Sequence, residues 1–101
     1  MHKNKQEIID YHAEVEAEAT ELLEETGSDF TLDDVKNVIY NEEESDDFQK
    51  VIAMFDDGNP ENLSNILETV TDAWNYFPHK LTNGLSPTEV LFEYEQKNKN
   101  I

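Results

Sequence analysis

The sequence of 101 residues contains neither cysteine nor arginine. Without cysteine the chain can form no disulfide and no thiolate metal site. Its cations are 7 lysines, set against 24 acidic residues. Proteins that bind nucleic acid directly use clustered lysine and arginine to neutralise phosphates. The sequence therefore argues against direct binding of nucleic acid.

Long hydrophobic runs are also missing. No apolar stretch approaches the roughly 18 residues that a membrane-spanning helix requires. Residues 1–5 lead directly into charged sequence, without the apolar segment of a signal peptide. We therefore expect no contact with membranes and a cytoplasmic location.

The formal net charge is −17, and apolar residues make up 37% of the chain, less than in most globular domains. Ten per cent of the residues are aromatic, and clear periodicity argues against disorder. A chain of this length can build one core. We expect a single domain over residues 1–101, with a small core, that exists either as a monomer or as a homodimer.

Apolar residues recur at three- and four-residue steps in five segments, and no segment alternates as a strand would. This pattern predicts an all-α fold of about five helices, covering approximately residues 6–25, 32–40, 46–55, 60–77 and 87–95. Gly27 should end the first helix. Thr31, Ser45, Asn59 and Ser86 are the expected N-caps of the other four.

The apolar faces of these helices predict the core. Phe30 and Leu85 are expected to pack on Val35 and Val90 as hydrophobic staples. The side chains expected to be buried are Ile8, Tyr11, His12, Val15, Ala19, Leu22, Leu23, Leu32, Val35, Ile39, Phe48, Val51, Ile52, Phe55, Leu63, Ile66, Leu67, Val70, Ala73, Trp74, Val90, Leu91 and Tyr94.

Charge is divided unevenly along the chain. Residues 1–61 hold 19 acidic side chains and 4 lysines, whereas residues 62–101 hold 5 acidic side chains and 3 lysines. The sequence thus predicts an acidic three-helix part, residues 1–58, and a near-neutral helix-loop-helix part, residues 59–101.

Residues 73–87, AWNYFPHKLTNGLSP, contain no acidic residue. Pro78 must end the preceding helix, and Asn83-Gly84 can reverse the chain. One interpretation is a structural corner held to the core by Trp74, Phe77, Leu81 and Leu85. The other is a recognition corner that exposes Tyr76, His79 and Lys80, which we expect to be the partner-binding residues.

The same stretch carries a motif. Asn75, Pro78-His79-Lys80, Gly84, Ser86-Pro87 and Glu89 form an N-x-x-P-H-K…G-x-S-P-x-E pattern. It resembles a motif in small uncharacterised prokaryotic proteins and, more weakly, the tail of integrase-core transposases. Phe77 replaces the arginine usual in those transposases, and no strands are predicted to carry their catalytic carboxylates. The resemblance therefore implies a prokaryotic protein, and no activity can be carried over from either group to this chain.

Chemical sites find little support in the sequence. His12 and Glu16 lie one helical turn apart, a spacing that can bind a divalent metal, but no third ligand is evident. Residues 56–59 lack the alternating oxygens and the distal Glu of a calcium loop. His79 could act as a general base, although no partner that would orient it is identifiable. We predict no catalytic, cofactor-binding or metal-binding residues.

The sequence favours a small acidic protein-interaction module, with a basic protein as one candidate partner. One alternative is an acidic nucleic-acid mimic that blocks a DNA- or RNA-binding protein, because a dense negative surface can occupy a basic one. A second alternative is an enzyme that uses His79.

Overall fold

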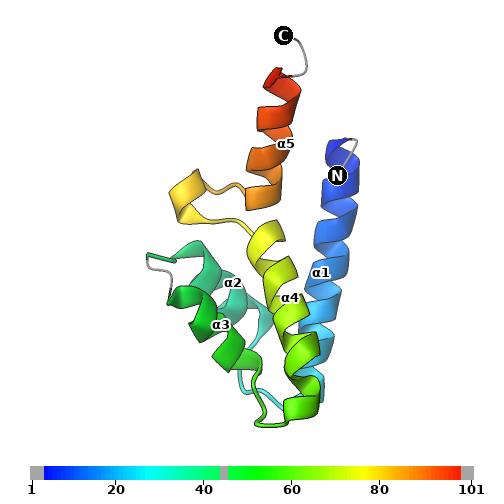
Figure 1. Cartoon of the computed structure of the whole chain (residues 1–101), viewed down its shortest axis with the longest axis vertical. Helices are drawn as coiled ribbons and strands as arrows, with labels where there is room; N and C mark the ends of the chain where they lie inside the picture. The colour runs from blue at the N-terminus through cyan, green and yellow to red at the C-terminus, as the bar shows by residue number, and fades with distance from the viewer. Residues whose placement is uncertain (1–3, 44–45, 99–101) are drawn as a thin grey trace.

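A computed structural model describes residues 4–43 and 46–98 (Figure 1). They form five α-helices and two short 3-10 turns, without a β-strand in this part of the chain, so the predicted all-α class is confirmed. The helices are α1 (Lys5–Glu25), α2 (Leu32–Tyr40), α3 (Asp47–Phe55), α4 (Leu63–Tyr76) and α5 (Pro87–Asn98), and the 3-10 turns are η1 (Pro60–Asn62) and η2 (Lys80–Thr82).

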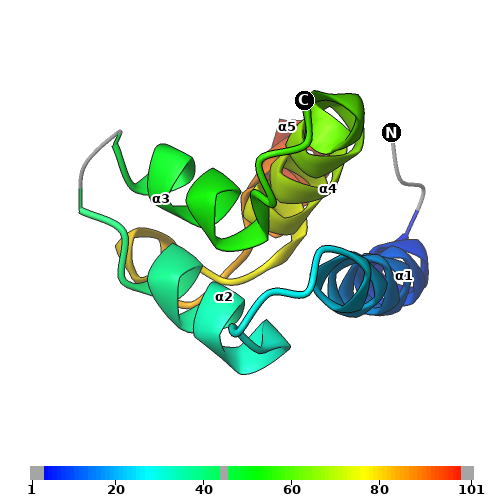
Figure 2. The same cartoon turned by 90° about the horizontal axis from the view of Figure 1, so that it is seen from below.

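The helices are arranged around α4. The long helix α1 runs alongside α4 in the opposite direction, and α3 packs on the other side of α4 (Figure 1). Seen from below, α2 and α3 form a pair beside α1 and α4 (Figure 2). Helix α5 contacts α4 and the first part of α1 and projects beyond the other helices. The molecule is consequently elongated, 49 × 26 × 21 Å.

The core lies where α1, α2, α3 and α4 meet, and it ends at Phe77, the residue that caps α4. Most of the side chains predicted to be buried on these four helices are buried. The buried core cluster is Val15, Ala19, Leu22, Leu23, Val35, Ile39, Val51, Met54, Phe55, Ile66, Val70, Ala73 and Phe77, and Leu32, Val38, Phe48, Ile52, Trp74 and Tyr76 pack against it while partly exposed.

The helix ends follow the predicted capping residues. Gly27 has a φ of 66°, which a residue with a side chain adopts at a cost, and it follows the last turn of α1. Thr31 and Asp34 form a capping box at α2, and Ser86 and Glu89 form one at α5. Asn59 caps the 3-10 turn that leads into α4. The predicted cap Ser45 lies outside the described residues.

Several apolar side chains expected in the core are exposed instead. On α5, the prediction is wrong for Val90, Leu91 and Tyr94, because α5 extends past the end of α4 and only its inner face has neighbours. Leu81 sits on the outside of η2 rather than holding the corner to the core. The other apolar side chains that were expected to be packed but are exposed are Tyr11, Phe30, Leu63 and Leu67.

Within the described residues, none of the helices is both long enough and apolar enough to span a membrane.

Candidate functional site

His79 is buried, with 1% of its surface exposed, so the expectation of an exposed His79 is wrong. Both ring nitrogens are engaged: Nδ1 lies 2.5 Å from Oε1 of Glu42, and Nε2 lies 2.7 Å from the backbone oxygen of Trp74. The backbone N–H of His79 donates to the carbonyl of Leu85, and its carbonyl accepts from Gly84. His79 thus ties the corner to α2 and α4.

Pro78 explains why the Trp74 carbonyl needs this partner. In a continuing helix, the N–H of residue 78 would donate to the carbonyl of residue 74, four positions earlier. Proline has no N–H, so α4 ends at Tyr76 and that carbonyl loses its backbone donor. The imidazole of His79 takes the place of the missing N–H.

The contacts also define where protons lie. A carbonyl oxygen only accepts hydrogen bonds, so Nε2 of His79 carries a proton. Nδ1 of His79 lies against the carboxylate of Glu42. The Trp74 ring makes an edge-on contact with the His79 ring, 5.0 Å between centroids, and a second edge-on contact with the Phe48 ring. We call this network of His79, Glu42 and the Trp74 carbonyl the clamp. Its role is structural, because no nitrogen of His79 faces an open space that could hold a substrate.

Tyr76 and Lys80 are the other two residues predicted to bind a partner. Tyr76 is partly buried and stacks on Tyr11 of α1, 4.7 Å between ring centroids. Burial and, to a smaller extent, the nearby Tyr11 raise the pKa of Tyr76, against a hydrogen bond with Thr88. Lys80 is exposed on η2. The structure therefore separates the three predicted partner-binding residues into one buried, one partly buried and one exposed; their role in binding stays a prediction.

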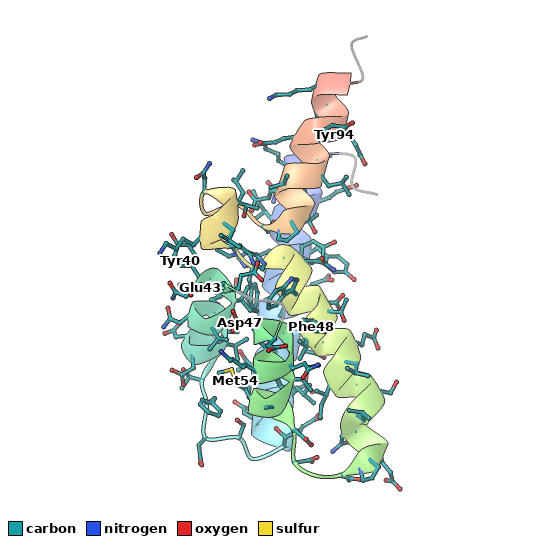
Figure 3. The ribbon with its side chains drawn as sticks, turned by 60° about the vertical axis from the view of Figure 1, so that its left-hand side comes forward. Tyr40, Glu43, Asp47, Phe48, Met54 and Tyr94 are labelled. Atoms are coloured by element: carbon teal, nitrogen blue, oxygen red, sulfur yellow. The ribbon has the colours of Figure 1, made fainter. Side chains whose placement is uncertain are left out.

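A second candidate site lies at one end of the molecule, which we call the tip and define as residues 4–13 and 77–98. It comprises the first part of α1, the corner and α5, at the top of Figure 1. Among the described residues, the four most exposed large apolar side chains all lie here: Leu81 (68%), Tyr94 (64%), Ile9 (59%) and Leu91 (54%). Tyr94 lies on the part of α5 that projects above the other labelled side chains (Figure 3).

A cavity of about 200 Å³ opens beside α5 at the tip. Its apolar walls come from α1, the end of α4 and α5, and its polar groups include His12. Nε2 of His12 is shielded from solvent and makes no hydrogen bond, and it lies 3.7 Å from Oε1 of Glu16. The residues that line the cavity are Lys5, Ile8, Ile9, His12, Tyr76, Glu89, Phe92 and Glu93.

Charge divides between the tip and the rest of the protein, which we call the body (residues 14–43 and 46–76). The tip contains three lysines and five acidic residues, whereas the body contains two lysines and eighteen acidic residues. Lys36 pairs with Glu16 at 2.7 Å, and Lys50 pairs with Asp47 at 2.9 Å. Most of the negative charge of the described chain therefore lies in the body.

The body concentrates carboxylates where α1 and α4 meet. Glu18, Glu21 and Glu25 of α1 and Glu68 of α4 line a shallow hollow of about 160 Å³. Burial, followed by the charges of Glu18 and Glu68, raises the pKa of Asp72 beside them. The charge of Asp72, the largest of several causes, raises the pKa of Tyr11. Besides burial, the neighbouring carboxylates thus disfavour a further negative charge on this face.

The sites considered for metals gain no support from the geometry. His12 and Glu16 face each other, but within residues 4–43 and 46–98 no group of three or more His, Asp or Glu side chains could hold a metal ion. The side chains of Asp56 and Asp57 are used locally, each accepting a hydrogen bond from a backbone N–H two residues later.

Sequence reasoning missed two features of these sites. The first is Glu42, which lies 37 residues from His79 in the chain, between the predicted second and third helices. The second is the exposed face of α5, which carries the same apolar spacing as a buried face. The sequence held a signal for the contact between His79 and the Trp74 carbonyl but none for Glu42: Pro78 removes a donor from α4, and a polar group nearby can replace it. Comparisons with protein-family models, with curated proteins and with solved structures yield no match for this chain.

Proposed function

We propose that this protein is an interaction module that binds another protein chain through the tip. The observation that carries the proposal is the gathering of the four most exposed large apolar side chains at this end. Scattered exposed apolar residues are normal on a protein surface, whereas several at one end of the molecule, where one of them, Ile9, also lines a cavity, are typical of binding sites. Low net charge at the tip adds support, because charged residues are depleted in the centres of interfaces.

In this proposal, direct contact with the partner within the corner shifts from His79 to the exposed residues of η2. Lys80 and Leu81 are both exposed on η2 and can touch a partner directly. His79 contributes from beneath, by fixing the corner against Glu42 and the end of α4. Tyr76 lines the cavity and is available to a side chain that enters it.

Capture experiments with two matched variants test the proposal. Leu91→Glu places a charge on the tip, and Leu67→Glu places the same charge on α4 at a leucine of comparable exposure. We expect Leu91→Glu to lose the bound protein and Leu67→Glu to keep it, with unchanged helicity in both. Equal capture by the two variants would contradict a binding role of the tip.

The acidic face between α1 and α4 favours a second candidate function, that of a nucleic-acid mimic. Its support is the group of carboxylates that line the hollow between α1 and α4, which gives this face a negative potential. A basic partner held there should be released by salt, because screening weakens exposed charge pairs. Replacing Glu18, Glu21 and Glu68 with Gln should abolish such capture, whereas Leu91→Glu should leave it intact. For the alternative of an enzyme that uses His79, the buried and doubly engaged ring offers no support.

A further inference from the structure

Asn83 is the only asparagine in the chain that a glycine follows. Such pairs deamidate more readily than other asparagine-containing pairs, because glycine has no side chain to shield the backbone nitrogen that attacks the asparagine amide. Asn83 and Gly84 are both exposed, at the turn of the corner. Asn83 is also the one residue other than glycine that has a positive φ within the described residues.

We propose that Asn83 is a site of spontaneous deamidation, and that the clamp at His79 keeps it unreactive for as long as the corner stays closed. This modification does not depend on what binds at the tip. It concerns the chemical lifetime of the corner itself.

The reaction needs no co-reactant other than water. The backbone nitrogen of Gly84 loses its proton and bonds to Cγ of Asn83, the bond between Cγ and Nδ2 breaks, and ammonia leaves. Water then opens the resulting five-membered imide. Attack at Cγ gives aspartate in a normal backbone. Attack at the backbone carbonyl gives isoaspartate, in which the chain continues through the side chain of residue 83.

The closed corner blocks this reaction in two ways. The N–H of Gly84 donates to the carbonyl of His79 at 2.9 Å, which holds the proton on the attacking nitrogen. The backbone of Asn83 lies at a φ of 57° and a ψ of 35°. At this ψ, the nitrogen of Gly84 lies nearly opposite Cβ of Asn83 across the Cα–C bond, whereas ring closure requires both on the same side. The attack therefore requires a rotation that breaks the hydrogen bond to His79.

His79 determines how often the corner opens. Its carbonyl accepts the hydrogen bond from Gly84, and its ring is fixed by Glu42 and by the carbonyl of Trp74. Opening of the turn costs free energy because these contacts must loosen, and a reaction confined to the open form slows in proportion to the open fraction. The rate of deamidation at Asn83 therefore reports on the clamp.

Either product changes the corner permanently, because ammonia has left. Aspartate places a carboxylate within residues 73–87, which otherwise contain none. Isoaspartate adds a carbon atom to the backbone before Gly84. The turn is closed by hydrogen bonds from Asn83 to Lys80 and from Gly84 to His79, and both depend on its present length. We expect isoaspartate to loosen η2, the segment that presents Lys80.

Incubation of the full-length protein at mildly alkaline pH, with and without guanidinium chloride, tests the proposal. Peptide mapping by mass spectrometry measures the loss of ammonia at Asn83. Asn37, exposed on α2 and followed by valine, provides the internal comparison. We expect Asn83 to react faster than Asn37 in the denatured chain, and to react more slowly in the folded protein than in the denatured chain by a factor of about ten or more.

Three variants test whether the clamp controls the reaction. His79→Ala should accelerate deamidation of the folded protein by about tenfold, because buried acceptors lose their partner. Glu42→Gln should accelerate it less, and Lys80→Ala, the exposed neighbour, should leave the rate unchanged. If circular dichroism shows His79→Ala to be unfolded, the comparison of Glu42→Gln with Lys80→Ala decides.

Each contrary result overturns a defined part. Equal rates at Asn83 in the folded and the denatured chain overturn protection by the corner, and no preference for Asn83 over Asn37 in the denatured chain overturns the site. Equal rates for Lys80→Ala and both clamp variants overturn control by the clamp. Protein that carries isoaspartate, separated by ion exchange, should melt at a lower temperature than Asn83→Asp. Equal melting temperatures would overturn the expected effect of the longer backbone.

Discussion

His79 donates a hydrogen bond from Nε2 to the carbonyl of Trp74, the acceptor that Pro78 leaves without a backbone donor. The side chain of one residue thus completes a helix that its neighbour interrupts. The same ring reaches Glu42 at the end of α2, so the termini of two helices meet on one imidazole. Removal of this ring would leave two polar groups without partners in a largely buried setting.

We expect His79→Ala to destabilise the fold strongly. Each buried acceptor left without a partner costs about 1–3 kcal/mol, and the lost ring packing against Trp74 adds to this. The measurement is the free energy of unfolding in urea. Lys80→Ala, one residue along and exposed, is the matched control and should change stability by less than about 0.5 kcal/mol. Similar free energies of unfolding for the two variants would show that the contacts of the His79 ring do not stabilise the fold.

Glu42→Gln separates charge from hydrogen bonding at the same clamp. The amide oxygen can still accept a hydrogen bond from Nδ1 of His79, but the carboxylate charge is gone. We expect Glu42→Gln to lower stability less than His79→Ala does. When Glu42→Gln is added to His79→Ala, we expect no loss beyond that of His79→Ala alone, because the two residues act as one unit. A double-mutant cycle measures this coupling, and additive losses would show that the pair is not coupled.

Trp74→Ala should lower stability by about 3 kcal/mol, the lower end of the range for a buried aromatic, because part of the ring is exposed. The ring packs against Phe48 of α3 and against His79 of the corner, so its removal loosens both contacts. The unfolding midpoint in urea provides the readout. An unchanged midpoint would place Trp74 outside the stabilising core.

Asp72→Asn should stabilise the protein at neutral pH. The pKa of Asp72 is raised in the folded state by burial and by the charges of Glu18 and Glu68, so the folded state binds its proton more tightly than the unfolded state does. Ionised Asp72 therefore costs stability above the raised pKa, and this cost disappears as the pH falls below the ordinary carboxyl value near 4. The gain in melting temperature from Asp72→Asn should be largest at pH 7 and shrink on acidification.

Asp57→Asn serves as the control of opposite sign. The backbone N–H of Asn59 and then the side chain of Asn62 lower the pKa of Asp57, so its ionised form is favoured in the folded state. Removal of that charge should lower the melting temperature slightly at neutral pH, and the difference should vanish at low pH. A rise in melting temperature for both variants would mean that general charge repulsion, and not the position of Asp72, governs the effect.

Added NaCl should raise the melting temperature of the wild-type protein. The body holds eighteen acidic side chains against two lysines, and those along α1 and α4 lie within reach of one another. Screening shortens the Debye length from about 30 Å at 0.01 M salt to about 10 Å at 0.1 M, which weakens this repulsion. Melting followed by circular dichroism over this range gives the answer, and a flat response would indicate well-dispersed carboxylates.

The parts of the fold that depend on local chemistry could be predicted from the sequence. Gly27, Thr31, Asn59 and Ser86 mark helix ends because caps form between residues a few positions apart. The burial of α5 could not be predicted, because it depends on how far α4 extends, which is a property of the packed molecule. Val90, Leu91 and Tyr94 have the spacing of a core face, and only the arrangement of the helices shows that nothing in the described chain covers them.

The structure gives a physical reason for the absence of acidic residues from residues 73–87, which could not be found in the sequence pattern alone. The C-terminal end of α4 carries the negative end of its helix dipole, and Glu42 approaches from α2. A carboxylate in the corner would be repelled by both. The observation that first pointed to a recognition surface is thus explained in part by the structure beneath it.

The uneven distribution of carboxylates limits the stoichiometry of any assembly that uses the tip. Each molecule has one end of low net charge, and a partner bound there would occupy it. A further acidic partner would have to attach to the acidic body, which would repel it. A high density of like charge, usually considered only for its effect on solubility, would here limit the number of acidic partners that one molecule can bind.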